Sequence, residues 1–392
     1  MHAKPDLFLD ECRALYGKTL LEDIVPFWMK YGIDREHGGI SNVLDDSGRA
    51  VNHDKYTWSQ GRALWTFSAL YNRVEKRPEW LAFARHLFRY LETHGPDEGG
   101  RWMFRFGADG TILDRDLSIY ADGFAMAGLG EYFTATGDPR ARALALETSR
   151  TIRRCLARPG SYGVAPYAIP EGMKMHGIPM IFSFFFYNLG VAIGEPSLCE
   201  DGLARAHEIL DDFYDPRRDA IMEFVRLDRR PDVTPAGRTC VMGHSIEGLW
   251  FLLSMFEHSG RTERIPLCCR LIRRHLELAW DEEQGGLLLA RDLDQAGPCF
   301  WQKADFKAWW VHCEALVATA YAYRHTREAW CLEWHEKVRD YAFSHFPVPT
   351  GEWTQWLDRQ GHKAASAALP VKDPFHLPRA LIYLTDLMGR KS

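Results

Sequence analysis

The sequence predicts an all-α protein, a single (α/α)6 toroid with short β-hairpins in the connecting loops. Two observations carry this prediction: long segments with helical periodicity, and a hairpin signal that returns at a nearly fixed spacing. The chain has 392 residues, 46% hydrophobic and 26% charged, as is usual for a folded globular protein. No stretch has the composition of a linker, so we expect one domain over residues 1–392.

Many segments repeat apolar residues at intervals of three and four, which indicates amphipathic helices. Many of them begin with a capping residue or proline and end near glycine. The predicted helices cover residues 7–31, 58–74, 79–93, 122–136, 139–157, 200–213, 245–257, 265–279, 308–325, 328–346 and 377–388. Pairs of such helices, each joined to the next pair by a short hairpin, would form one repeated unit.

Between the helices, an acidic turn that ends in glycine recurs before a short β-like run. Gly39, Gly100 and Gly286 end three of these turns, and weaker copies start at Asp215 and at Pro349, the second of which contains Gly351. Gly39 and Gly100 are 61 residues apart, and Gly286 and Gly351 are 65 apart. A fixed period means one supersecondary unit repeated, and about six units fit in this length. The alternative to a closed toroid is an open helical scaffold, but no polar cap repeat ends the chain.

In such a toroid the N-termini of the inner helices meet the long loops on one face, where we expect a deep aromatic pocket. Aromatic residues make up 13% of the chain, which suits a large core or a pocket that stacks on sugar rings. The net charge of −5 argues against a broad nucleic-acid surface, and no stretch reaches the roughly 18 apolar residues of a membrane helix. Nine cysteines without zinc-type spacing, and no signal-peptide core, predict a reduced, cytoplasmic setting.

The stretch around His244 and Glu247, at the start of a predicted helix, has the strongest chemical pattern. A spacing of three places the imidazole and the carboxylate on one helical face, one turn apart. A carboxylate so placed orients and polarises a catalytic histidine. The alternative is a buried histidine with a salt-bridge partner. No second histidine follows at the fourth position, so we expect no metal and no other cofactor.

His376 begins another predicted helix, because Pro378 suits a first helical turn. The positive end of the helix dipole disfavours the imidazolium form and helps to keep His376 neutral. A neutral imidazole removes or relays a proton; alternatively, His376 only caps the helix. Together with His244, it points to proton transfer at a carbon next to a carbonyl group.

Arg62 lies among residues that otherwise look buried, so it needs a partner. Either it stabilises a ligand oxygen on which negative charge develops, or it forms a salt bridge to Asp122 or Asp54. Asp122 either caps a helix or holds a substrate hydroxyl. The tandem tryptophans 309 and 310 and Glu314 either face a sugar or pack in an aromatic helix. The predicted substrate-binding residues are Tyr56, Trp58, Asp122, Trp309, Trp310, Glu314 and Arg379.

In their order and spacing, five stretches resemble the N-acylglucosamine 2-epimerase family over almost the whole chain. They are Gln60-Gly61-Arg62, residues 120–124, residues 243–250, Trp309-Trp310 with Glu314, and residues 375–379. The resemblance implies an (α/α)6 barrel that interconverts sugars by removing and returning the proton next to the carbonyl group. It makes His244 and His376 the acid/base pair, Glu247 the orienting carboxylate and Arg62 an oxygen-binding group. It also suggests a homodimer.

Within that family, cellobiose 2-epimerases and mannose isomerases carry a third histidine in a helix near the middle of the chain. The matching stretch here, residues 175–183, looks more like the N-acylglucosamine branch, and His176 falls out of register before the helix. We therefore predict a 2-epimerase that interconverts N-acetyl-D-glucosamine and N-acetyl-D-mannosamine in their open-chain forms. One histidine removes the C2 proton, the other returns a proton to the opposite face, and Arg62 stabilises the enediolate. No P-loop motif is present, so a nucleotide site would go unrecognised.

Three other functions stay open on the sequence alone. An aldose–ketose isomerase on the same barrel would convert mannose to fructose with one shuttling base. A glycoside hydrolase or lyase would use paired carboxylates, with Asp122, Glu247 and Glu314 as candidates. A catalytically silent scaffold would bind sugars without exchanging the C2 proton.

Overall fold

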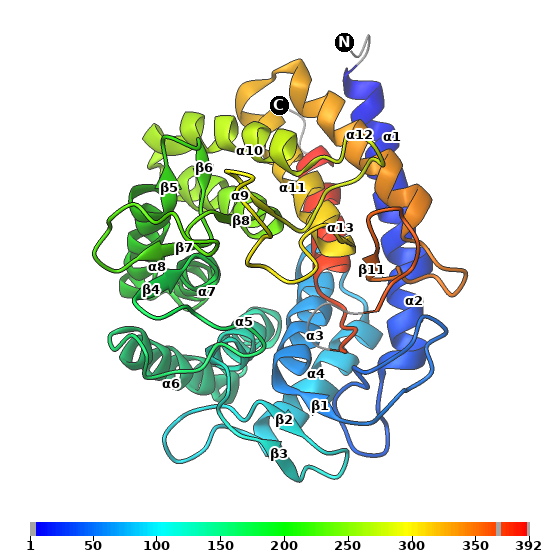
Figure 1. Ribbon diagram of the computed structural model, residues 1–392. Coiled ribbons are helices and arrows are strands. Elements are labelled where there is room, and N and C mark those ends of the chain that lie inside the picture. Colours follow the sequence, from blue (N-terminus) through cyan, green and yellow to red (C-terminus); the bar gives the residue numbers. More distant parts are fainter. Residues whose placement is uncertain (1–4, 366–369, 390–392) are drawn as a thin grey trace.

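Figure 1 shows a ring of helices in two layers, with short strands in the loops between them. The structure is a computed structural model that describes residues 5–365 and 370–389. Within these residues, six inner helices surround the centre: α3 (Thr57–Ala69), α5 (Ile119–Thr136), α7 (Gly177–Ile193), α9 (Met242–Ser259), α11 (Trp309–Thr326) and α13 (His376–Gly389). Six outer helices cover them: α1 (Pro5–Lys18), α4 (Pro78–Thr93), α6 (Pro139–Leu156), α8 (Pro196–Glu208), α10 (Ile265–Ala279) and α12 (Ala329–His345). This double layer is the predicted (α/α)6 toroid.

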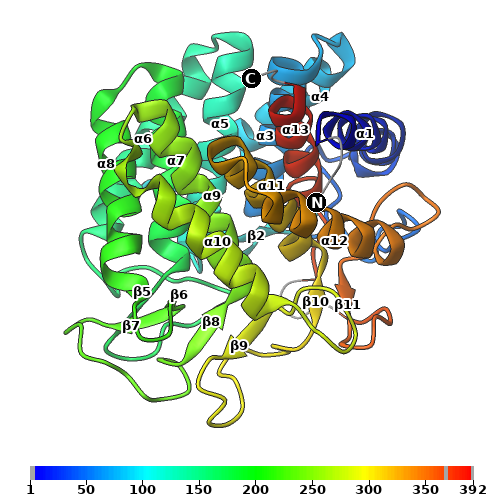
Figure 2. The ribbon, with the colours of Figure 1, turned by 90° about the horizontal axis from the view of Figure 1, so that it is seen from above.

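The inner helices contact one another in chain order, and α13 contacts both α11 and α3, which closes the ring. Outer helices α4, α6, α8, α10 and α12 each pack on the inner helix that precedes them. The first helix, α1, packs instead on the last helix, α13, as Figure 2 also shows. Segments from opposite ends of the sequence therefore complete the ring.

Burial explains which helices lie inside. Every residue of α3 is buried, whereas α10 buries mainly positions three and four apart, because only one of its faces meets the core. The eleven helices predicted from periodicity are confirmed, and α7, in the stretch matched to the family's middle helix, was not among them. It is hydrophobic almost all round, so it lacks the amphipathic period. Pro179 lies in its first turn, where backbone N–H groups have no partner within the helix.

Shorter helical segments extend or join these helices. They are η1 (Thr19–Ile24), α2 (Val25–Phe27), η2 (Trp28–Gly32), η3 (Leu70–Val74), η4 (Ile209–Phe213) and η5 (Thr262–Arg264). In the described ranges, no helix combines the length and the apolar character needed to cross a membrane.

The strands are short and antiparallel, and three of them lead directly into the N-terminal ends of inner helices. Most of the labelled strands gather at one end of the helices in Figure 2. β1 (Lys55–Tyr56), β8 (Thr239–Val241) and β10 (Lys307–Ala308) run directly into α3, α9 and α11. The pairings are β1 with β2 (Arg105–Phe106) and β2 with β3 (Ile112–Asp114), β4 (Met173–Met175) with β7 (Phe224–Arg226), β5 (Tyr214–Asp215) with β6 (Ala220–Ile221), β8 with β9 (Ala290–Asp292), and β10 with β11 (Trp356–Leu357).

The predicted repeat appears in the backbone of the acidic turns. Gly39 and Gly286 adopt φ of 68° and 76°, a left-handed conformation that favours glycine. In three repeats, the fourth residue of the inner helix accepts a hydrogen bond from a backbone N–H just after the turn. The acceptors are Gln60 for Ile40 (2.7 Å), Asp122 for Trp102 (2.9 Å) and His312 for Leu287 (2.9 Å). These bonds fix each inner helix against its hairpin, and so fix the side chains at its N-terminus.

Candidate active site

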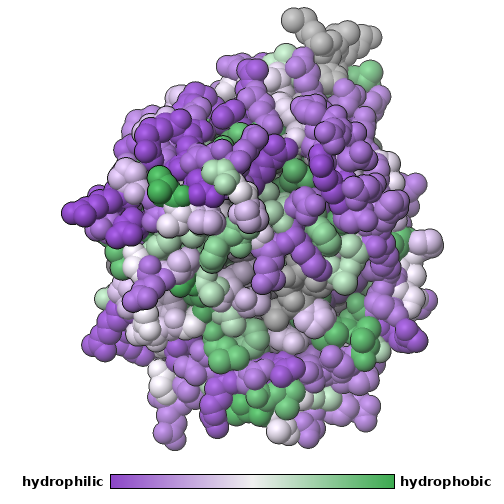
Figure 3. Space-filling view, viewed as in Figure 1, coloured by the Kyte–Doolittle hydropathy of each residue, from purple (hydrophilic) through white to green (hydrophobic). Residues whose placement is uncertain are grey.

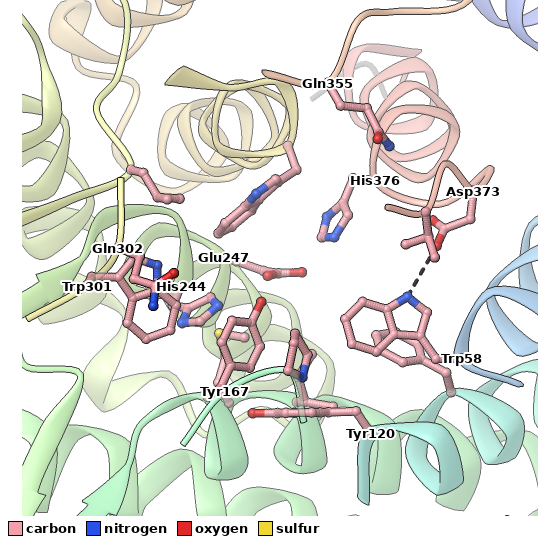
Figure 4. Close-up of a pocket in the computed structure, with 18 of the residues that line it drawn as sticks. Trp58, Tyr120, Tyr167, His244, Glu247, Trp301, Gln302, Gln355, Asp373 and His376 are labelled. Carbon is pink, nitrogen blue, oxygen red and sulfur yellow. Dashed lines mark hydrogen bonds between the residues drawn. The ribbon is translucent and has the colours of Figure 1, made fainter. Parts of the chain in front are cut away.

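A cavity of about 430 Å³ opens where the inner helices begin, as the sequence predicts. On the face shown in Figure 3, hydrophobic side chains gather near the middle and hydrophilic ones surround them. Figure 4 shows polar groups among the aromatic walls: His244, Glu247 and Gln302 on one side, and His376, Asp373 and Gln355 on the other. The aromatic lining residues are Trp58, Tyr120, Phe124, Tyr167, Phe224, Phe300, Trp301, Trp309, Trp310 and Trp356.

His244, the third residue of α9, lines the cavity with its Nδ1 turned away toward a carboxylate. Nδ1 lies 3.0 Å from Oε2 of Glu223, which sits between β6 and β7 and is buried. An ionised carboxylate only accepts hydrogen bonds, so Nδ1 carries a hydrogen and Nε2 remains for a ligand. Burial acts to lower the pKa of His244, but the negative charges of Glu223 and Glu247 outweigh it and raise that pKa.

His376, the first residue of α13, lines the same cavity and also has a carboxylate behind it. Its Nδ1 lies 2.7 Å from Oε1 of Glu314, and its Nε2 lies 3.5 Å from Nη2 of Arg62. Burial lowers the pKa of His376, and the cations Arg62 and Arg379 add to this effect against the opposing charge of Glu247. The pKa lies well below its usual value, so His376 is neutral near pH 7, as the sequence predicts.

Trp310, the second residue of α11, spans the gap between the two imidazoles. The centroid of its indole lies 5.5 Å from that of His244 and 5.5 Å from that of His376, with the rings inclined by 35° and 40°. One wall of the cavity therefore touches both histidines and holds them on either side of a common space.

Glu247 lines the cavity but does not orient His244, so this prediction is wrong. Its carboxylate accepts a hydrogen bond from Nη2 of Arg379, while Glu223 takes the imidazole. The spacing of three does place His244 and Glu247 on one face of α9. Arg379 nevertheless attracts the carboxylate toward α13, because its guanidinium is buried and positively charged.

Arg62 lies in the cavity wall, and its partner is neither of the two expected acids. Its Nη1 lies 3.3 Å from Oδ2 of Asp373, and its guanidinium packs on the rings of Trp58 and Phe124. Asp54 pairs instead with Arg105, and Asp122 with Arg101. The aromatic packing leaves the edge of the guanidinium directed at Asp373 and His376.

Three of the seven predicted substrate-binding residues line the cavity: Trp58, Trp309 and Trp310. Asp122 does not, because as the fourth residue of α5 it holds the backbone of Trp102, like Gln60 and His312 in their repeats. The other three predicted residues do not line the cavity either. Tyr56 packs against Phe104, and Glu314 and Arg379 lie buried behind His376.

Several lining residues were missed by the sequence analysis. Tyr167 points its hydroxyl into the cavity in Figure 4, and Gln302 and Gln355 place side-chain amides at its edge. These residues lie in irregular loops, where helical periodicity gives no signal. One sequence pattern could have indicated them, because Trp301-Gln302 and Gln355-Trp356 each place a glutamine next to a tryptophan. The carboxylate of Glu223 follows the weak hairpin copy at Asp215.

One cluster in the described residues has the donor atoms of a metal site: Glu247, Glu314 and His376, within 4.8 Å of one another. The guanidinium of Arg379 already pairs with both carboxylates of this cluster. Its Nη2 lies 2.7 Å from Oε1 of Glu314 and also donates to Glu247. A divalent cation would have to displace this buried positive charge, so the donor set does not suit one.

The fold and the cavity together define an (α/α)6 toroid with a small-molecule site between two carboxylate-backed histidines. The sequence profile of the N-acylglucosamine 2-epimerase (GlcNAc 2-epimerase) family matches residues 38–380. The N-acylglucosamine 2-epimerase of Homo sapiens is 30% identical over 94% of this chain and 88% of that protein, and that of Mus musculus is 29% identical over 94% and 90%. The chain therefore belongs to the N-acylglucosamine 2-epimerase family, a family of carbohydrate epimerases, and is an isomerase.

Solved structures share the fold. A sugar epimerase from a ruminal bacterium has a TM-score of 0.84 at 21% identity, with 97% of this chain and all of that chain covered. A D-mannose isomerase has a TM-score of 0.79 at 18% identity, covering 98% of this chain and 100% of that chain. At these identities the likeness confirms the (α/α)6 architecture.

Proposed function

We propose that this enzyme interconverts N-acetyl-D-glucosamine and N-acetyl-D-mannosamine by moving the C2 proton of the open-chain sugar. The observation that carries the proposal is the pair of imidazoles on either side of Trp310, each with its Nδ1 on a buried carboxylate. Two separate bases invert a carbon directly, because one removes a proton from one face and the other adds a proton to the opposite face. The 29–30% identity to N-acylglucosamine 2-epimerases supports this choice of substrate.

The charges of the two histidines suit this reaction. Neutral His376 accepts the C2 proton of one epimer at Nε2, and the electron pair moves onto O1 of the sugar. Arg62, beside His376, donates a hydrogen bond to that developing oxyanion. Protonated His244 then gives its Nε2 proton to the other face of C2. The reverse reaction exchanges the two roles.

The charge of the cavity favours an uncharged sugar over a sugar phosphate. Its arginine is already paired with Asp373, no lysine is among its described lining residues, and Glu247 adds a negative charge. A phosphate would need free cations to replace its water. The hydrolase alternative is weakened, because Asp122 and Glu314 of its three carboxylates lie outside the cavity lining.

We further propose a cytoplasmic homodimer whose residues 1–392 act as one catalytic domain. All nine cysteines are free thiols, which suits a reducing compartment. Light scattering on the purified protein gives the oligomeric state.

The decisive experiment is proton NMR in D2O with N-acetylglucosamine, N-acetylmannosamine and mannose as separate substrates. We expect each N-acetyl sugar to yield the other, with deuterium at C2 of the product. Fructose from mannose as the main product would establish an aldose–ketose isomerase instead. Binding without exchange at C2 would establish a silent sugar-binding protein.

A further inference from the structure

We propose that Glu223 is the positioning residue for His244, holding its Nδ1 hydrogen so that Nε2–H faces the reacting carbon. The inference rests on the proposed function, because it assigns His244 the part of an acid. It concerns a residue that touches neither the cavity nor the substrate, and that no sequence pattern singled out. Glu223 orients His244, which is the role that the sequence analysis assigned to Glu247.

The backbone of Glu223 is fixed on two sides. Its carbonyl oxygen accepts a hydrogen bond from the N–H of His176 (2.7 Å), and its N–H donates to the carbonyl of Thr239 (2.9 Å). These bonds tie it to the start of α7 and to β8, the strand that leads into α9. The carboxylate and the helix that carries His244 therefore share one rigid support.

The carboxylate of Glu223 has a single close hydrogen-bond partner. Oε2 lies 3.0 Å from Nδ1 of His244, and Oε1 has no hydrogen-bond partner among residues 5–365 and 370–389. Its side chain is fully buried. A buried carboxylate with so few partners disfavours folding, so its charge is better explained by its effect on His244 than by stability.

His176 does not compete for this charge. Its Nδ1 is 3.9 Å from Oε2 of Glu223, beyond hydrogen-bond length, and neither ring nitrogen has a partner in the described part of the chain. Burial lowers its pKa well below the usual value, so the ring is neutral. The ring packs near Phe213 and outside the cavity lining, which separates it from the two histidines of the cavity.

The other groups that act on His244 leave Glu223 as its main charge partner. Glu247, on the same helix, also raises the pKa of His244, but less than Glu223 does, and its carboxylate is paired with Arg379 of α13. His176, at the start of α7, is uncharged, and the phenol of Tyr167 stays protonated because burial raises its pKa to about 12. Removing the charge of Glu223 should therefore make His244 a stronger acid.

The test compares the wild type with Glu223→Gln in full-length enzyme. Glutamine keeps an acceptor for Nδ1–H but removes the charge. We expect the alkaline limb of kcat/KM to move to lower pH by about one unit, since a neighbouring opposite charge shifts a pKa by roughly that much or more. KM at the pH optimum should change little. Glu257→Gln, which removes a carboxylate 3.7 Å from His325 outside the cavity, is the matched control and should leave the profile in place.

A second measurement is made on the wild type and does not depend on the identity of the sugar. Wild-type enzyme with 13C-labelled histidine rings is titrated by NMR, and the signal absent from His244→Asn is assigned to His244. A hydrogen on Nδ1 in the neutral ring and a pKa above 6.5, the usual value, support the proposal. A hydrogen on Nε2 in the neutral ring, a pKa below that value, or an unmoved alkaline limb in folded Glu223→Gln overturns it. A wild type that titrates as expected but epimerises neither N-acetyl sugar overturns only the proposed substrate.

Discussion

The Cα atom of Gly243 lies directly against the indole of Trp310. A Cβ atom added at Gly243 would stand 2.3 Å from Cζ3 of that ring, well inside van der Waals contact. The residue just before His244 thus lets Trp310 reach the space between the two histidines. This contact joins α9 to α11 at the point where both helices contribute to the cavity.

Replacement of Gly243 by alanine should displace Trp310 and lower epimerisation by roughly 10-fold or more, because small misplacements of positioning groups have large effects on rate. The measurement is kcat and KM for both epimers, with thermal unfolding to confirm the fold. Gly17→Ala is the control, since a Cβ there meets nothing within 4 Å. Wild-type kinetics in a folded Gly243→Ala would show that the position of Trp310 is not critical.

Replacement of either His244 or His376 by alanine should reduce turnover by roughly 10²-fold or more if each transfers a proton. The more informative measurement is the incorporation of solvent deuterium at C2 of the sugar. With His376 intact, His244→Ala should still exchange the proton of one epimer while failing to invert it, because removal of that proton needs only one base. Near-normal inversion in a folded variant would remove that histidine from the mechanism.

The pH dependence of kcat/KM should be bell-shaped with a broad plateau. Activity requires His244 protonated and His376 neutral, or the reverse. The pKa of His244 is raised, so the alkaline limb should fall above pH 6.5, and that of His376 is lowered, so the acid limb should fall well below it. A narrow optimum centred on pH 6.5 would contradict this separation.

Two buried histidines outside the cavity should make the fold sensitive to acid. Burial lowers the pKa of His275 to about 4 and that of His312 to about 3, and each accepts a hydrogen bond from a backbone N–H. Their folded pKa values lie below the unfolded value of about 6.5, so the unfolded chain binds more protons as pH falls. The stability they contribute is complete above pH 6.5 and is lost as pH falls toward 4.

His312→Gln should therefore flatten the dependence of the unfolding free energy on pH. Each such histidine contributes a slope of up to about 1.4 kcal/mol per pH unit between pH 6.5 and its folded pKa. Urea unfolding at pH 6.5, 5.5 and 4.5 measures the change. An unchanged slope would mean that His312 is protonated in the folded protein.

Periodicity and repeat spacing were sufficient to predict the toroid, because amphipathic helices and glycine turns leave local patterns. Periodicity did not reveal α7, because a helix buried on all sides has no polar face. In the site, His244 and His376 were found because each stands at a helix start beside a recognisable motif. Glu223, 21 residues before His244, could not be found, since backbone hydrogen bonds to His176 at the start of α7 and to Thr239 in β8 place it there. The prediction that Asp122 binds substrate was wrong, because its carboxylate accepts a hydrogen bond from the hairpin backbone instead.

The packing of α1 on α13 has a consequence for how this protein is made. During synthesis α1 leaves the ribosome long before α13, the helix that it covers and that carries His376. The apolar face of α1 must therefore stay without this neighbour until α13 has been made. Activity should then arise in one late step, when α13 packs against α1. A fusion at either end should be tested for its effect on this packing before any loss of activity is ascribed to the cavity.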